Sequence, residues 1–74
     1  MKHCFIYYYV QSQEDNHIPE IVYHTKNKKT NEYYYKFLYK EKAKKLAEEQ
    51  KKLFPVLKFR VIECIEIFEL SEWF

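Results

Sequence analysis

The 74-residue chain contains no glycine, only two prolines and a single tryptophan. Without glycine, no glycine-rich phosphate-binding loop can form, so the usual motifs of nucleotide-hydrolysing and dinucleotide-binding enzymes are absent. Turns must be made by Asn, Asp, Ser and Pro, whose local backbone preferences suit them. The sequence therefore argues against mononucleotide chemistry.

The chain also lacks any arrangement of side chains that specifies a reaction. Its serines, Ser12 and Ser71, lie in polar segments with no histidine at a suggestive spacing. A general-acid pair would need two carboxyl groups in contrasting environments. Glu63 and Glu66 point to opposite faces of a strand, which leaves the C-terminal glutamates as solvating residues. We expect a protein that is not an enzyme.

Metal binding is not indicated either, because the histidines and cysteines have none of the paired spacings of zinc motifs. The candidate ligands are His3, Cys4, His17, His24 and Cys64. We expect neither a metal nor a cofactor. Cys4 and Cys64 are predicted to be small buried hydrophobic side chains, and a disulfide between them is the alternative if their strands are neighbours.

The N-terminal segment Met1–Val10 does not have the features of a secretory signal. Its apolar run is short and is not followed by a small-residue cleavage site. No window of 18 residues is apolar and uncharged, so no membrane-spanning segment is expected. Two cysteines without a secretory signal fit a reducing compartment, and we expect a cytoplasmic protein.

The length predicts a single domain over residues 1–74 with little spare core. A chain of this size buries about 60–65% of its unfolded surface. Aromatic residues make up 20% of the chain, and each can bury roughly 150–250 Å². With 47% hydrophobic and 32% charged residues, the composition is that of a folded domain.

Positive charge is concentrated in the middle of the chain. Residues 26–60 carry twelve Lys or Arg against four Glu, whereas residues 1–25 sum to −2 and residues 61–74 to −4. The net charge of +2 therefore conceals a middle of +8. Four of the eight tyrosines lie between Tyr33 and Tyr39, so aromatic and basic side chains are close together. This combination is typical of a binding surface.

Three segments before the basic helix are predicted as strands. Cys4–Val10 is apolar on both alternating faces, as in a central strand covered on both sides. Glu20–Lys26 follows a polar loop, and Tyr33–Tyr39 alternates with a period of two. The aromatic stripe of the third segment also continues into a helical pattern. The alternative is therefore a ββαβ order with a longer helix that begins near Asn31.

Lys40–Leu53 is predicted as a helix. Its sequence contains two favourably oriented i,i+4 ion pairs, each worth about 0.2–0.5 kcal/mol, namely Glu41 with Lys45 and Glu48 with Lys52. Pro55 ends the helix because proline disfavours helical geometry at the preceding residue. Tyr39 provides no capping side chain, so the start of the helix is predicted to be poorly capped.

Val56–Leu70 is predicted as the last strand. Its alternation of apolar and charged residues changes phase after Arg60, and its glutamates recur every three residues. Either a bulge near Glu63 shifts the register, or the strand ends near Ile67 and the tail 71–74 folds separately.

The predicted fold is thus a small α+β domain with a βββαβ order and one helix on one face of a mixed sheet. Because the crossover from the third strand passes through the helix, the fourth strand is predicted to run parallel to the first and third. The apolar runs of the first and last strands favour central positions, which gives the strand order 3-2-1-4.

The basic turn and the tyrosines meet the requirements of nucleic-acid binding, in which cations replace counterions and rings stack on bases. The candidate residues are Lys26, Lys28, Lys29 and Lys36. A three-stranded sheet with a basic hairpin followed by a helix resembles the arm-binding domains of tyrosine integrases over Ile21–Gln50. That resemblance implies insertion of the sheet into the DNA major groove.

Protein binding uses the same side chains differently, since Tyr, Trp and Phe anchor protein interfaces. The residues expected to contact a partner are Tyr33, Tyr34, Tyr35, Lys36, Trp73 and Phe74. In size and style the chain is similar to the stoichiometric inhibitors that phages and other mobile elements encode. We expect a non-catalytic module that binds a larger protein, as a monomer or homodimer. Nucleic-acid binding by the basic, tyrosine-rich three-stranded sheet is the alternative.

Overall fold

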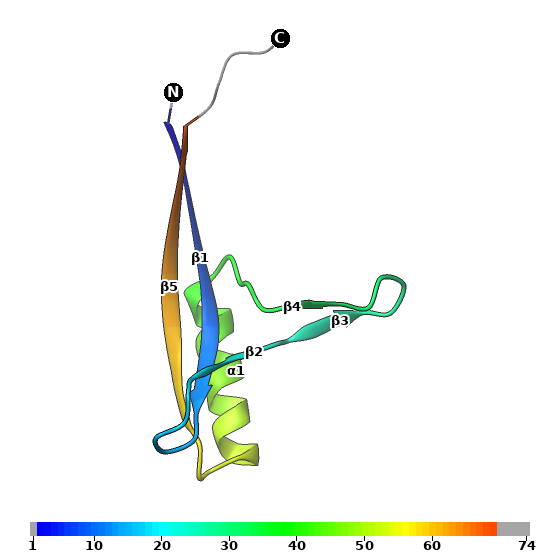
Figure 1. Cartoon of the computed structure of the whole chain (residues 1–74), viewed down its shortest axis with the longest axis vertical. Coiled ribbons are helices and arrows are strands. Elements are labelled where there is room, and N and C mark those ends of the chain that lie inside the picture. The colour runs from blue at the N-terminus through cyan, green and yellow to red at the C-terminus, as the bar shows by residue number, and fades with distance from the viewer. Residues whose placement is uncertain (1, 70–74) are drawn as a thin grey trace.

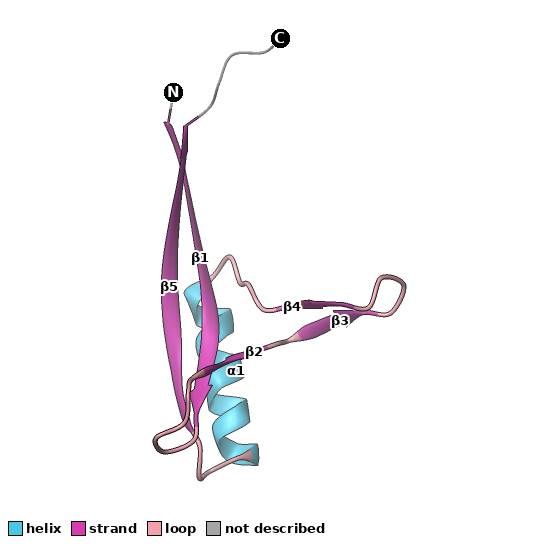
Figure 2. Cartoon of the chain, in the orientation of Figure 1, coloured by secondary structure: helices cyan, strands magenta, loops and turns pink. Residues whose placement is uncertain are grey.

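The computed structural model describes residues 2–69 as one helix and five strands in two sheets (Figure 1). In chain order the elements are β1 (Lys2–Gln13), β2 (Glu20–Val22), β3 (Thr25–Asn27), β4 (Glu32–Tyr34), α1 (Lys40–Leu53) and β5 (Lys58–Glu69). Figure 2 shows the helix beside a long two-stranded ribbon, with a hairpin projecting to one side. The predicted α+β class is confirmed.

Strands β1 and β5 form an antiparallel ladder from Lys2 opposite Glu69 to Gln13 opposite Lys58. The register is continuous, so the predicted bulge near Glu63 is wrong, and β5 continues past Ile67. Both strands are rich in aromatic and β-branched residues. Their cross-strand pairs keep the ladder regular even after Arg60, where the alternation of apolar and charged residues in β5 changes phase.

The main sheet has the order β2-β1-β5, so β1 is central, as predicted. β5 runs antiparallel to β1, whereas the parallel direction was predicted. The helix runs in the same direction as β1, and a tight turn at its end reverses the chain into β5 (Figure 1). In this turn the Leu57 amide donates to the Phe54 carbonyl at 3.1 Å. In a parallel crossover the helix would run opposite to β1; because α1 runs in the same direction as β1, the reversal after it makes β5 antiparallel.

The predicted order 3-2-1-4 is wrong at its outer strand, because the third segment does not join the main sheet. Instead β3 and β4 form a separate antiparallel pair, with Thr25 opposite Tyr34 and Asn27 opposite Glu32. The predicted strand Glu20–Lys26 is divided between β2 and β3. Of the predicted strand Tyr33–Tyr39, only Tyr33 and Tyr34 belong to a regular strand, β4. Among the described residues, no three-stranded sheet of the kind implied by the integrase resemblance is formed.

We call β3, β4 and the turn between them the arm. Its turn ends at Asn31, which has a φ of 58°. Asparagine tolerates this left-handed conformation better than most residues, so it takes the place of a turn glycine. The Asn27 Oδ1 atom accepts a hydrogen bond from the Lys29 amide at 2.9 Å and closes the turn from within. The lack of glycine therefore does not prevent a tight hairpin.

The helix has the predicted bounds, Lys40–Leu53, so the alternative of a longer helix from Asn31 is wrong. Tyr39 at the N-cap has an extended backbone and makes no capping side-chain bond, as predicted. At the other end, the Lys51 ammonium donates to the carbonyls of Pro55 and Leu57 at 2.8 and 2.7 Å. These bonds attach the last turn of the helix to the loop that leads into β5.

The core is small and is confined to one half of the ribbon. Within residues 2–69, only Tyr7, Val10 and Ala43 are buried. Beyond the N-terminal end of the helix, the ribbon consists of residues 2–6 and 65–69, which we call the distal ribbon (Figure 1). Its apolar side chains are exposed, because the helix does not extend over them.

The cysteines do not pair. Cys4 lies opposite Ile67 and Cys64 lies opposite Tyr7, so the two thiols are on different faces of the ribbon, and both are free. Cys64 is half-buried but Cys4 is exposed, so the prediction of a buried Cys4 is wrong. The cause is that Cys4 lies on the distal ribbon, where nothing in the described chain covers it.

Candidate binding surface

The two faces of the ribbon carry different side chains. Val10, which is fully buried, lies opposite Val61, and Phe59 lines a cavity together with Ala47 of the helix. Since alternate residues of a strand point to opposite faces, the helix covers the face that carries these residues. Phe5, Tyr7 and Tyr9 therefore lie on the other face.

A continuous series of six aromatic rings crosses this second face. The ring centroids of Phe5 and Tyr7 are 5.9 Å apart, and those of Tyr7 and Tyr9 are 6.5 Å apart. Tyr35 contacts Tyr9 edge to face at 5.6 Å. We call the whole series the aromatic track, and its members are Phe5, Tyr7, Tyr9, Tyr35, Tyr23 and Tyr33.

The track continues from the main sheet to the arm. Tyr23 lies 6.0 Å from Tyr35 and 5.5 Å from Tyr33, measured between ring centroids. Offset and edge-to-face contacts of this kind contribute about 0.5–1.5 kcal/mol each beyond the area that they bury. The track therefore brings together side chains from three segments of the chain.

Lys36 lies over the middle of the track. Its Nζ atom is 4.5 Å from the Tyr7 ring centroid, 5.8 Å from that of Tyr35, and 3.9 Å from the Glu66 Oε1 atom. A cation over tyrosine faces is attracted by the ring quadrupoles, and the carboxylate adds a partly exposed ion pair. The ammonium of Lys36 thus faces two aromatic rings and one carboxylate within the surface.

The arm end of the track is open to solvent. Tyr23 is 51% exposed and Tyr33 is 55% exposed, although both rings make aromatic contacts. Beside them a depression of about 320 Å³ is lined by Tyr33, Tyr34, Tyr35 and Lys36. These four residues were predicted from the sequence to contact a partner, and the structure brings them together. Trp73 and Phe74, which were predicted with them, lie outside the described residues.

Sequence reasoning missed the other four members of the track, Phe5, Tyr7, Tyr9 and Tyr23. The signal was present, because aromatic residues occupy every second position from Phe5 to Tyr9. That alternation was interpreted as part of a strand covered on both faces. Only one face is covered by a helix, and the aromatic side chains cover the other themselves.

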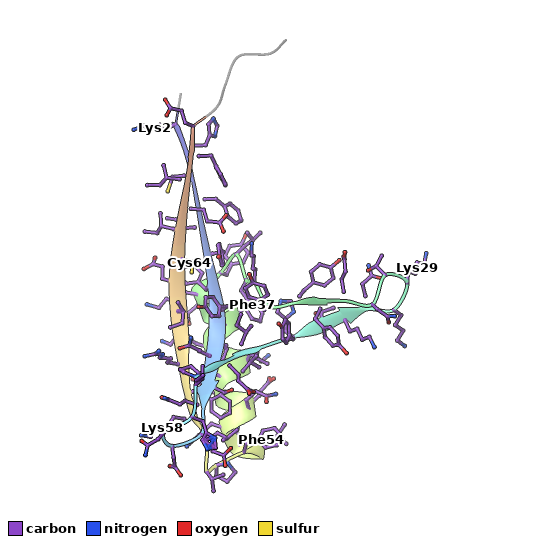
Figure 3. All side chains as sticks on the ribbon, in the orientation of Figure 1. Lys2, Lys29, Phe37, Phe54, Lys58 and Cys64 are labelled. Atoms are coloured by element: carbon purple, nitrogen blue, oxygen red, sulfur yellow. The ribbon has the colours of Figure 1, made fainter. Side chains whose placement is uncertain are left out.

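Three of the predicted basic residues, Lys26, Lys28 and Lys29, are exposed on the arm. Lys29 lies at its tip, far from the ribbon (Figure 3). Lys26 is beside the track, with its Nζ atom 5.3 Å from the Tyr33 ring centroid. Lys36, by contrast, contacts Tyr7 and Glu66 on the ribbon. The four lysines therefore do not form one continuous basic surface.

His24 fixes the base of the arm to the ribbon. Its Nε2 atom lies 2.9 Å from the Lys36 carbonyl oxygen, and its Nδ1 atom lies 2.7 Å from the Thr25 hydroxyl. Since a carbonyl only accepts, Nε2 donates, and in the neutral ring Nδ1 accepts from Thr25. The ring also stacks on Phe37 at 4.2 Å, and Phe37 exchanges two backbone hydrogen bonds with Tyr8, at 2.8 and 2.7 Å.

Two phenols at the centre of β1 are less acidic than ordinary tyrosines. Hydrogen bonding to Cys64, together with burial and the nearby Glu66, raises the pKa of Tyr7. On the other face, burial and the Glu63 carboxylate raise the pKa of Tyr8, whose hydroxyl donates to Glu63 Oε1 at 3.3 Å. At neutral pH both side chains are uncharged hydrogen-bond donors.

Within residues 2–69, no group of three His, Cys, Asp or Glu side chains is arranged to hold a metal ion. The same part of the chain includes no helix with the length and apolar character needed to cross a membrane. No protein family, curated protein or solved structure matches the chain. Arguments about function therefore rest on the aromatic track and the arm.

Proposed function

We propose that the protein is a non-catalytic binding module that docks on a larger protein through the aromatic track and inhibits it by occupying its surface. The observation that carries this proposal is the run of six contiguous rings, whose arm end is half exposed. Tyr7 in the middle of the track is buried, but Tyr23 and Tyr33 at its arm end are half exposed, and such exposed aromatic surface on a small protein suits a partner.

The charges around the track favour a protein over a nucleic acid as its partner. The positive charge of Lys36 is balanced by Glu66, and Arg60 on the same face donates through Nε to the Gln11 side chain at 2.7 Å. A polyanion needs unpaired cations along its path. A tyrosine surface whose central lysine is paired with a carboxylate instead resembles the centre of a protein interface, where charged residues are depleted.

The test compares track variants with a matched tyrosine outside the track. Tyr23→Ala and Tyr33→Ala each remove a half-exposed ring from the track, whereas Tyr39→Ala removes a 70% exposed ring at the start of the helix. Purified variants are first checked for folding, and partner affinity is then measured for the protein that co-purifies with the wild-type chain. We expect at least one track variant to lose about 2 kcal/mol or more of binding free energy, and Tyr39→Ala to lose little.

If all three variants bound the partner as tightly as the wild-type chain, the track would be rejected as the docking surface. Loss of binding by Tyr39→Ala alone would move the interface to the start of the helix. The variants do not perturb the ladder between β1 and β5, since all three side chains lie outside it.

A second candidate function, binding of nucleic acid by the arm, is favoured by the position of three exposed lysines on a projecting hairpin (Figure 3). A narrow arm with cations at its end has the dimensions to enter a groove of a duplex. Affinity would then fall with salt, with a log–log slope near −0.9 for each phosphate contacted.

This candidate is tested by charge reversal at Lys26, Lys28 and Lys29, with reversal at Lys40, Lys44 and Lys45 of the helix as the control. The arm variant should lose most of the salt dependence of binding to a duplex or single-stranded probe, and the helix variant should retain it. A flat salt response of the wild-type protein would reject nucleic-acid binding by the arm.

A further inference from the structure

We propose that β5 pairs with the β5 strand of a second copy of this chain, antiparallel and about a two-fold axis at Glu63. The pairing joins two three-stranded sheets into one continuous six-stranded sheet. This inference goes beyond the proposed function and does not depend on it, because it uses the outer edge of β5, whereas the rings of the aromatic track come from β1, the arm and the segments beside the arm.

The backbone of β5 offers a free edge. Tyr8 exchanges both of its backbone hydrogen bonds with Phe37, at 2.8 and 2.7 Å, so its N–H and C=O groups point away from β5. Its partner in the ladder, Glu63, therefore belongs to a non-hydrogen-bonded pair, and its own N–H and C=O groups point outward. Because alternate residues of a strand direct their backbone groups to the same edge, the N–H and C=O groups of Phe59, Val61, Ile65 and Ile67 also point outward.

An edge of this length is unusual in a small protein. Natural edge strands are usually short, bulged or interrupted by proline, because a regular edge recruits further strands. β5 is twelve residues long, continuous in register and without proline. Within the described chain, the main sheet ends at β5, and no other strand pairs with its outer edge.

The side chains of β5 select one register. In an antiparallel pair, residues directly opposite each other point their side chains to the same face of the sheet. A two-fold axis that relates two copies of β5 must therefore pass through a residue and not between two residues. With the axis at Glu63, Arg60 lies opposite Glu66 of the partner subunit on the track face. On the helix face, Val61 then lies opposite Ile65 of the partner subunit, and Phe59 opposite Ile67 of the partner subunit.

The neighbouring registers are chemically poorer. An axis at Cys64 places Arg60 opposite Phe68 of the partner subunit and Glu63 opposite Ile65 of the partner subunit. An axis at Ile62 places Val61 opposite Glu63 of the partner subunit. Opposite charges and paired apolar side chains stabilise a ladder, whereas these mixed pairs do not. The axis at Glu63 carries two costs, since it sets two glutamates of like charge directly opposite each other and places Lys58 opposite Phe68 of the partner subunit.

The two-fold arrangement also covers the distal ribbon. Ile65 and Ile67 are 58% and 70% exposed because the helix does not extend over this part of the ribbon. Antiparallel pairing places this uncovered end of β5 beside the end of the partner strand that is covered by a helix. Between the helix and β5 lies an open cavity of about 660 Å³, lined by Ala47, Glu48, Lys51, Lys52, Lys58 and Phe59.

This cavity is complementary in charge to the distal ribbon of a second copy. In the proposed register, Ile67 of the partner subunit lies beside Phe59, which lines the cavity. Glu69 of the partner subunit, at the acidic end of its β5, lies on the helix face, toward the helix lysines that line the cavity. A strand that is basic at one end and acidic at the other is complementary to itself when it is reversed.

The test uses the full chain, with sedimentation equilibrium to measure the dimer dissociation constant and circular dichroism to verify folding. Arg60→Glu and Glu66→Arg each turn two symmetry-related attractive pairs into repulsive ones, so each should weaken the dimer by about tenfold or more. The double variant should regain most of the affinity. Glu63→Gln removes the repulsion at the axis and should tighten the dimer, a gain that no role within a single chain predicts.

A covalent probe fixes the register. The axis at Glu63 sets Ile62 opposite Cys64 of the partner subunit, in a non-hydrogen-bonded pair that suits a disulfide. With Cys4→Ser removing the other thiol, Ile62→Cys should give a disulfide-linked dimer in a buffer of oxidised glutathione, whereas Phe59→Cys should not. A monomer at all concentrations overturns the proposal, as does a dimer unaffected by the charge variants or one linked through Phe59→Cys.

Discussion

Tyr7 and Tyr8 are adjacent in β1, lie on opposite faces of the ribbon, and both resist ionisation. The main cause for Tyr7 is hydrogen bonding to Cys64, whereas for Tyr8 it is burial. A group whose pKa is higher in the folded state than in the unfolded state stabilises the fold fully below the unfolded pKa, which is about 10 for tyrosine. That contribution is lost as the pH rises from about 10 through the folded value.

The alkaline titration of the tyrosines follows from these shifts. In the folded protein, the last phenols to ionise should be Tyr7 and Tyr8, as measured by the ultraviolet absorbance of tyrosinate. Tyr7→Phe should remove the most alkaline step and should make the free energy of unfolding fall less steeply above pH ~10. An unchanged titration curve in this variant would contradict the assignment.

Burial, rather than side-chain size, should determine the cost of truncations in this small core. Val10 is fully buried, whereas Leu46 on the helix is only half-buried. We expect Val10→Ala to cost about 2–3 kcal/mol and Leu46→Ala about 1–2 kcal/mol, although leucine loses more atoms. Urea denaturation of both variants measures the difference. A larger cost for Leu46→Ala would show that the core is centred on the helix instead of on β1.

The arm is the element whose position depends on the fewest contacts. Its two strands pair only with each other, and it is held to the ribbon by the bonds of His24 and by the contacts of the aromatic track. Elements with few buried contacts open locally at low free energy. The arm is therefore the first part of the described chain that we expect to detach from the ribbon.

His24→Ala should release the arm without unfolding the ribbon. The hydrogen bond from Nε2 to the Lys36 carbonyl, worth about 0.5–1.5 kcal/mol, and the stacking on Phe37 are lost, so hydrogen exchange of the arm amides should accelerate by roughly tenfold or more. Amides of the ladder between β1 and β5 should be little affected. The control is His17→Ala, which removes an exposed imidazole 3.9 Å from Glu14. Equal acceleration in both variants would show that His24 does not anchor the arm.

At the scale of the whole molecule, the fold is asymmetric along the ribbon. The helix covers the half of the ribbon that contains Val10, while the distal ribbon exposes Phe5, Ile6, Ile65, Ile67 and Phe68. An isolated two-stranded ribbon is at best marginally stable in water. The distal ribbon therefore gains most from any second copy that covers it.

A concentration-dependent stability follows from the proposed dimer. Because association stabilises the folded state by mass action, the thermal midpoint of the wild-type chain should rise with protein concentration. In Arg60→Glu the midpoint should depend much less on concentration. A wild-type midpoint that stays constant from well below to well above the measured dimer dissociation constant would contradict coupling between folding and association.

The bounds of the helix were predictable from the sequence because they depend on residues close to each other in the chain. Spaced Glu–Lys pairs favour Lys40–Leu53, Pro55 prevents its continuation, and Tyr39 offers no cap. The central position of β1 was equally accessible, since its unbroken run of β-forming residues distinguishes it from the shorter segments. Tyr33, Tyr34, Tyr35 and Lys36 are consecutive, so the sequence alone could also predict that they lie close together.

Only the tertiary structure decided which strands pair and which side chains meet. Local preference cannot tell whether Glu20–Lys26 forms one strand or two, because that depends on whether β1 or β4 competes successfully for its backbone. The antiparallel direction of β5 depends on the path of the whole chain. The aromatic track exists because residues from β1, the arm and the segments beside it converge, and such convergence between residues far apart in sequence is determined by packing of the complete fold.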